Sequence, residues 1–77
     1  MSTIDFQLQG DHVALNLLLK LVGLCDSGGA GKHLVATGAV LVDGQPESRK
    51  TCKIHGGQTV RCGDTEIHVR ADPGALH

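Results

Sequence analysis

Aromatic residues are almost absent from this sequence: Phe6 is the single one, and there is no Trp or Tyr. Domains that bind single-stranded nucleic acid commonly stack bases on aromatic side chains, so this mode of binding is disfavoured. A hydrophobic core must be aliphatic, and hydrophobic residues make up 40% of the 77 positions. A chain of this length forms one small domain.

Long apolar runs are also missing. No stretch approaches the roughly 20 apolar residues of a membrane-spanning helix. The first residues lack the basic segment and apolar run of a signal peptide. We therefore expect a cytoplasmic protein with no membrane contact.

Cysteine is scarce and shows no pairing pattern. Cys25, Cys52 and Cys62 are odd in number and form no C-x-x-C pair, which indicates reduced thiols packed as small apolar side chains. Cys52 and His55, with Cys62 and His68, are possible metal ligands, but their spacing is unlike that of a zinc ribbon. The sequence predicts no metal and no other cofactor, with a small metal site as a less favoured alternative.

Signatures of catalysis are missing as well. A glycine cluster ends in Gly31-Lys32 and resembles a Walker phosphate loop. That loop needs Gly at position 26 and Ser or Thr at position 33, where the chain has Asp26 and His33. We can recognise no nucleophile–base pair and no paired carboxylates, so we expect the protein not to be an enzyme.

Two helices are predicted in the first half of the chain. Apolar periodicity predicts a helix over 12–22, capped by Asp11 and ended by Gly23. Leucines cover most of the circumference of this helix, so we expect it to be sandwiched between a second helix and a sheet. A second helix begins at Asp26 or Ser27 and runs to about Thr37, with Gly38 as terminator. We expect the inward face of this second helix to consist of Ala30, Leu34 and Val35.

After Gly38 the hydrophobic period changes to two, which predicts strands. Asp43-Gly44 predicts a type I′ turn, and Pro46 marks an edge strand. Short strands are expected around 51–54, 56–62 and 65–69, and a possible first strand covers 3–8. The fold class is therefore α+β: two packed helices with a tight turn, followed by a small antiparallel sheet. We expect a single domain over 1–77, with its core at about 8–70 and a flexible tail at 71–77.

One helix face combines glycine with a positive charge. Gly28 and Gly29 precede Lys32 by four and three residues, so the three share a face near the positive end of the helix dipole. A polyanion could approach this bare backbone closely; alternatively, the glycines allow close packing against the first helix or an irregular first turn. His33 lies about 100° around the helix, and its protonation would strengthen anion binding if it borders the same surface.

The charge is polarised along the chain, although the net charge is only −1. Residues 45–61 carry four basic side chains and one acidic one, whereas the rest carry three basic and seven acidic ones. Arg49, Lys50 and Lys53 fall within five residues, and a turn at 50–51 would bring all three to one rim. We expect Lys32 to join them there.

The pattern resembles the αL RNA-binding motif of the ribosomal-protein-S-four superfamily. The resemblance rests on Ser27-Gly28 opening a second helix and on G-x-V-x-V-D-G over 38–44. More specifically, LKLVGLCDSGGAGK and VLVDGQPESRKTCKI resemble the small stand-alone bacterial YbcJ-type members. Gly28 stands where the superfamily commonly has Arg. The resemblance covers about residues 8–70.

The resemblance implies a non-catalytic module that binds structured RNA, ribosomal or transfer RNA, alone or within a ribonucleoprotein assembly. It implicates Ser27, Lys32, Arg49, Lys50 and Lys53 in RNA binding. With Gly28, Gly29 and His33, these form the predicted RNA-binding site of a monomer that reads phosphate spacing and shape rather than sequence. The alternative is a protein–protein adaptor whose basic rim meets an acidic partner.

Overall fold

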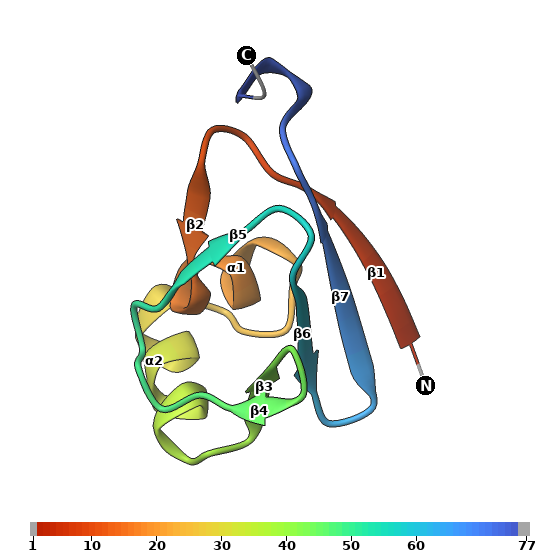
Figure 1. The fold of residues 1–77 in the computed structure, drawn as a ribbon. Coiled ribbons are helices and arrows are strands. Elements are labelled where there is room, and N and C mark those ends of the chain that lie inside the picture. The colour runs from red at the N-terminus through yellow and green to blue at the C-terminus, as the bar shows by residue number, and fades with distance from the viewer. Residues whose placement is uncertain (1, 76–77) are drawn as a thin grey trace.

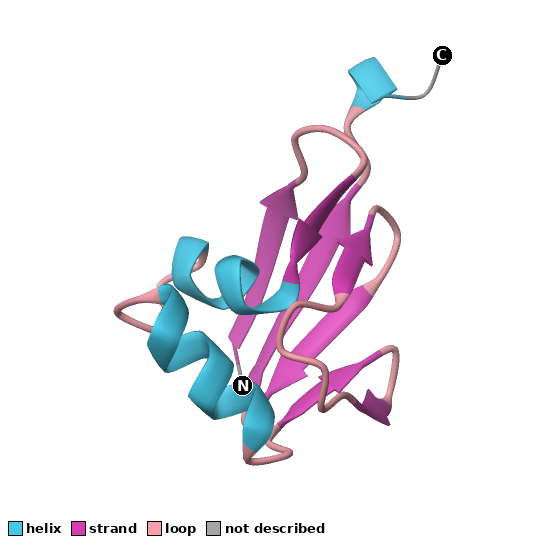
Figure 2. Ribbon diagram, turned by 90° about the vertical axis from the view of Figure 1, so that its left-hand side faces the viewer, coloured by secondary structure: helices cyan, strands magenta, loops and turns pink. Residues whose placement is uncertain are grey.

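The computed structural model describes residues 2–75 and has two layers, a sheet and a pair of helices that covers one of its faces (Figures 1 and 2). The larger sheet has five strands in the order β1-β7-β6-β3-β4, and a second sheet pairs β2 with β5. The strands are β1 (Ser2–Gln7), β2 (His12–Ala14), β3 (Val40–Val42), β4 (Gln45–Pro46), β5 (Lys53–His55), β6 (Thr59–Cys62) and β7 (Thr65–Arg70). The helices are α1 (Leu15–Leu21) and α2 (Gly28–Ala36), and a 3-10 turn, Pro73–Ala75, follows β7.

The expected α+β class is confirmed, but the expected order of helices followed by an antiparallel sheet is not. β1 precedes the helices and pairs in parallel with β7, with Ile4 opposite Ile67 and Phe6 opposite Val69 (Figure 1). The other neighbouring strands are antiparallel, so the five-stranded sheet is mixed. Parallel neighbours need a long connection, and here it is the whole chain between β1 and β7.

α1 is shorter than its periodicity predicts, and the prediction of Asp11 as its cap is wrong. The residues before Leu15 form β2, which pairs with β5 so that Val13 lies opposite Ile54. The cap residue is Ala14, whose side chain makes no capping hydrogen bond. Strand pairing satisfies the backbone groups of this segment and buries Val13, which outweighs its helical pattern.

The expected sandwiching of α1 is confirmed in part, because α1 packs against both the sheet and α2. Leu15, Leu18 and Leu19 are fully buried, whereas 41% of Leu17 and 56% of Leu21 remain exposed. The stripe that carries Leu17 and Leu21 is therefore left open, which the sequence did not predict.

α2 begins and ends where the sequence predicts. The Ser27 hydroxyl accepts a hydrogen bond from the Ala30 amide at 3.1 Å, and Gly38 follows the helix with a φ of 79°. Val35 is buried and Leu34 is half-buried, as expected, but Ala30 is exposed.

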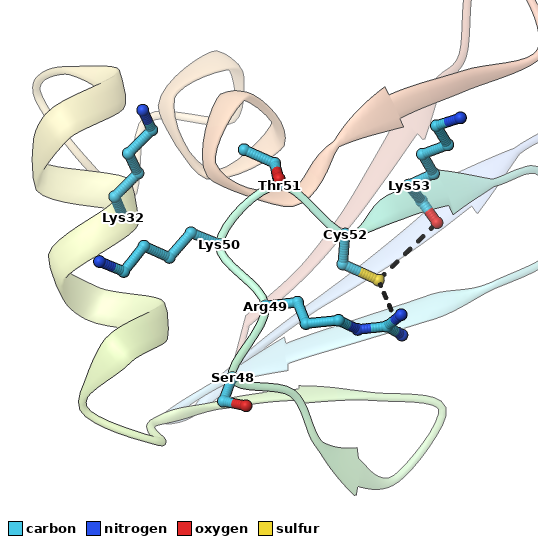
Figure 3. A pocket seen from close by; sticks show the side chains of 7 residues that line it. All are labelled: Lys32, Ser48, Arg49, Lys50, Thr51, Cys52 and Lys53. Carbon is cyan, nitrogen blue, oxygen red and sulfur yellow. Dashed lines mark hydrogen bonds between the residues drawn. The ribbon is translucent and has the colours of Figure 1, made fainter.

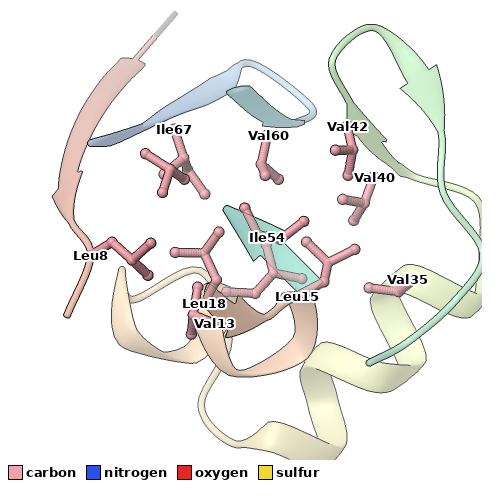
Figure 4. Packing of buried hydrophobic residues seen from close by; sticks show 12 residues of the cluster. Leu8, Val13, Leu15, Leu18, Val35, Val40, Val42, Ile54, Val60 and Ile67 are labelled. Carbon is pink, nitrogen blue, oxygen red and sulfur yellow. The ribbon is translucent and has the colours of Figure 1, made fainter. Parts of the chain in front are cut away.

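The core lies between the two layers (Figure 4). Val40, Val60 and Ile67 from the sheet point toward Leu15 and Leu18 of α1. The predicted turn between β3 and β4 is confirmed by positive φ at both central residues, 51° at Asp43 and 83° at Gly44. The buried residues of this core are all aliphatic, as the composition requires, and the half-buried Phe6 packs against them.

The segment after β7 is hydrogen-bonded to the body of the domain. The Asp72 carboxylate accepts from the amide of Gly10 at 2.7 Å and from that of Gly74 at 2.8 Å, and these bonds lower its pKa. Residues 76 and 77 of the predicted tail lie outside the described residues. The flexibility of 71–77 and the core limits of 8–70 stay predictions.

Candidate functional site

An open hollow of about 820 Å³ lies between α2 and the loop that joins β4 to β5 (Figure 3). Lys32 of α2 lines one side, and six consecutive residues from the loop and the start of β5 line the rest. This surface, called here the basic hollow, is formed by Lys32, Ser48, Arg49, Lys50, Thr51, Cys52 and Lys53. The helix lysine and the downstream basic run therefore meet at one surface.

A turn at 50–51 gives the basic run its shape. The Cys52 amide donates to the Arg49 carbonyl at 3.2 Å and closes the turn. The loop is fixed to the start of α1, because the Leu15 amide donates to the Cys52 carbonyl at 2.9 Å and the Asn16 amide donates to the Lys50 carbonyl at 3.1 Å. The first amides of a helix have no partners within it, and here the loop carbonyls take that role.

The backbone of Asn16 is also in close contact with α2. A Cβ on Gly31 would lie 2.5 Å from the Asn16 carbonyl oxygen, so the two helices approach too closely for any side chain at this position. Close packing, the alternative reason for the glycines, thus explains Gly31. At Gly29 an added Cβ would meet only the Ser27 hydroxyl, at 3.8 Å, so packing does not require this glycine. Asn16 therefore contacts both α2, which carries Lys32, and the loop that joins β4 to β5.

The four cations of the basic hollow point in two directions (Figure 3). Lys32 and Lys50 lie on the side of α2, whereas Arg49 and Lys53 lie on the other side of the loop. Arg49 forms an ion pair with Glu47, with 2.8 Å between Nε and Oε1. Their hydrogen bond raises the pKa of Arg49 and lowers that of Glu47. Among residues 2–75, the three lysines form no ion pair.

The other four predicted site residues do not line the basic hollow. Ser27 caps α2, Gly28 and Gly29 form its first turn, and His33 is exposed on its surface. Their part in RNA binding stays a prediction. The structure adds Ser48, Thr51 and Cys52 to the lining, which sequence reasoning missed. The sequence signal that could have identified these three residues is their position beside and between Arg49, Lys50 and Lys53.

The candidate metal ligands lie in separate surroundings. His55 faces His12 across the β2–β5 pair, with 5.8 Å between ring centroids, whereas His68 lies 3.4 Å from a Glu66 oxygen. Burial raises the pKa of the half-buried Cys62 thiol, and the nearby Cys25 adds to the shift. In the part of the chain that the structure describes, no three His, Cys, Asp or Glu side chains gather to hold a metal ion.

A second groove of about 470 Å³, called here the apolar groove although Gln7, Gln9 and His12 also line it, lies beside the exposed face of α1. Leu17 and Leu21 line it with Phe6 and Leu8 from the β1 region. None of the helices within residues 2–75 is long and apolar enough to cross a membrane.

Comparison with known proteins finds relatives over most of the chain. The S4 domain family matches residues 6–70. The chain is 48% identical over 60 residues to "Putative RNA-binding protein YbcJ" of Escherichia coli strain K12, covering 78% of this chain and 86% of the relative. "Uncharacterized protein YbcJ" of Shigella flexneri matches with the same identity and coverage. The solution structure of E. coli YbcJ, described as having an αL motif involved in RNA-binding, superposes with a TM-score of 0.71 at 43% identity, covering 92% of this chain and 91% of that one.

Proposed function

The chain belongs to the S4 domain family, and we propose that it is a non-catalytic module that binds structured RNA through phosphate backbone and shape. The RNA-binding descriptions of E. coli YbcJ support this proposal. The observation that carries it is that Lys32 of α2 and the downstream Arg49, Lys50 and Lys53 line one open surface, with their charged ends on two sides of the loop. Four cations along one surface provide a site for successive phosphates of a polyanion.

The side chains of the basic hollow suit phosphate rather than base recognition. Lys32, Lys50 and Lys53 are exposed and would act as point charges toward successive phosphates. The hydroxyls of Ser48 and Thr51 can bond a phosphate or a ribose 2′-hydroxyl. Phe6 lies in the apolar groove and not in the hollow, so stacking on a base has no part in this mechanism.

The partner we propose is ribosomal or transfer RNA, bound by a monomer in the cytoplasm, either alone or within a ribonucleoprotein assembly. Both RNAs are rich in A-form helices, whose shallow minor groove presents phosphates and 2′-hydroxyls. The predicted contacts of Ser27, Gly28, Gly29 and His33 belong to this proposal. They would extend the contact along α2 beyond the hollow.

Binding of a structured RNA to two matched variants tests the function. We expect Lys32→Gln to weaken binding, because it removes a cation of the basic hollow. Lys20→Gln is the control: Lys20 is an exposed helical lysine outside the hollow, so affinity should stay close to that of the unmodified protein. Equal losses in both variants, or no binding by the unmodified protein, would contradict the proposal.

The RNA itself can be identified by crosslinking in cells followed by sequencing of the bound RNA. We expect the recovered sequences to be enriched in ribosomal or transfer RNA. The same experiment with Lys32→Glu and Arg49→Glu should lose that enrichment. Enrichment that survives both charge reversals would place the RNA contact elsewhere.

A protein–protein adaptor is the second candidate, and the apolar groove favours it. Exposed leucines such as Leu17 and Leu21 are typical of protein contacts when they border a groove. The adaptor could use this groove together with the basic rim, which suits an acidic partner. Nuclease treatment separates the two candidates: an RNA-dependent complex dissociates, whereas an adaptor complex remains.

A further inference from the structure

An acidic side chain, Glu47, lies outside the lining of the basic hollow but pairs with Arg49, which lines it. A carboxylate at this place repels an RNA phosphate, so its charge alone weakens binding. Glu47 is nevertheless held firmly: its amide donates to the Val40 carbonyl at 3.0 Å, and only 16% of its side chain is exposed. By contrast, 77% of the Arg49 side chain is exposed. The ion pair thus joins the mostly covered side chain of Glu47, on an anchored backbone, to the mostly exposed side chain of Arg49.

The carboxylate occupies one edge of the Arg49 guanidinium. Oε1 of Glu47 accepts from the Arg49 backbone amide at 3.1 Å and from Nε at 2.8 Å, and Oε2 accepts from Nη2 at 3.4 Å. Nη1 has no partner among residues 2–75, and the other contact of Nη2 is with Cys52 Sγ at 3.8 Å. Sulfur is a weak acceptor. The end of the guanidinium, formed by Nη1 and Nη2, therefore remains available.

We propose that Glu47 is a positioning residue, which holds Arg49 by one edge so that the other edge can grip an RNA phosphate at the basic hollow. This inference rests on the proposed RNA-binding function. Guanidinium binds phosphate best through two parallel hydrogen bonds, which require a defined orientation. An arginine that is already oriented loses less side-chain entropy when the phosphate binds.

Two substitutions with the same change of charge test the proposal. Glu47→Gln and Glu47→Ala both remove the negative charge, but only Gln keeps an oxygen that accepts from the amide and Nε of Arg49. Positioning predicts that the Ala variant binds a structured RNA about three- to tenfold more weakly than the Gln variant. Equal affinities for the two variants would overturn the proposal, because charge alone would then account for Glu47.

The same pair in an Arg49→Ala background shows whether Glu47 acts through Arg49. Without the guanidinium, we expect the Ala and Gln variants at position 47 to bind RNA equally. A difference that persists there means that Glu47 shapes the loop itself, and the proposal fails. If the unmodified protein binds no structured RNA, the proposed function is wrong. If it binds RNA, but the Ala and Gln variants at position 47 bind with equal affinity, the proposed function stands and only the positioning role of Glu47 is refuted.

Discussion

The substitution Gly31→Ala tests how the two helices hold the basic hollow together. In an unconstrained helix this change is stabilising by up to about 1 kcal/mol, because Ala has the higher helix propensity. Here the new Cβ would lie 2.5 Å from the Asn16 carbonyl oxygen and 3.2 Å from the Asn16 carbonyl carbon and Cα. These neighbours are backbone atoms, so α1 and α2 have to move apart. Such overpacking costs about 1–3 kcal/mol.

We therefore expect a net loss of up to about 2 kcal/mol in the free energy of unfolding, once a gain in propensity of about 1 kcal/mol is subtracted from the cost of overpacking. For a domain of this size, 1 kcal/mol corresponds to a change of about 4–8 °C in Tm. Thermal and urea unfolding followed by circular dichroism measure both quantities. RNA binding should weaken too, because the Asn16 amide also holds the Lys50 carbonyl.

Gly29→Ala is the matched control in the same helix. Its Cβ would meet only the Ser27 hydroxyl at 3.8 Å, so the change should leave stability unaltered or raise it by a few tenths of a kcal/mol. Gly31→Ala should thus lower the free energy of unfolding, whereas Gly29→Ala should leave it unchanged or raise it slightly. If Gly31→Ala is as stable as Gly29→Ala, the close contact between α1 and α2 does not exist, and the account of how Lys32 is placed is refuted.

Two further predictions concern the stability of the fold. Asp43→Asn should lower the free energy of unfolding by about 1 kcal/mol at neutral pH, because the carboxylate accepts from the Thr59 amide at 2.9 Å and from the Gln58 side chain at 3.1 Å. The backbone bond chiefly lowers the pKa of Asp43, so its contribution is complete above the ordinary value of 3.8 and is lost as the pH falls through the lowered value. The gap between the variant and the unmodified protein should close on acidification, and a constant gap in urea unfolding at each pH would contradict this. Leu21→Gln should change the free energy of unfolding by no more than about 0.5 kcal/mol, because 56% of Leu21 is exposed. Leu18→Ala, at a fully buried position, should lower it by about 2–5 kcal/mol. Similar losses in the two variants would show that the Leu21 side of α1 is covered as well.

The local signals in the sequence were sufficient for much of the fold. The two ends of α2 could be predicted from Ser27 and Gly38, because a helix cap and a left-handed terminating residue depend only on a few neighbouring residues. The turn at Asp43-Gly44 is local in the same sense. What failed depended on distant partners: the pattern before Leu15 looks helical, and only pairing with β5 makes it a strand. The parallel pairing of β1 with β7 likewise joins the two ends of the described chain.

The candidate site was predictable in part for the same reason. Apart from Lys32, the basic residues of the site can be read from one short segment, in which a turn at 50–51 was one of two possibilities. The turn is present, but Lys50 still points away from Arg49 and Lys53. The meeting of Lys32 with that segment was a plausible expectation, but its cause, the hydrogen bond and close contact at Asn16, is a matter of tertiary packing. The Glu47–Arg49 pair could not be derived from charge counting, which treats Glu47 only as a negative charge opposing the cations.

The central claim is that the basic hollow binds RNA phosphates, and the salt dependence of RNA affinity tests it most directly. About four phosphate contacts predict that the logarithm of the association constant falls against the logarithm of salt concentration with a slope of about −3 to −4. A double variant, Lys32→Gln with Lys50→Gln, should bind with a slope shallower by about two, whereas Lys20→Gln should keep the original slope. An affinity that does not depend on salt, or a double variant whose slope matches that of Lys20→Gln, would contradict the account.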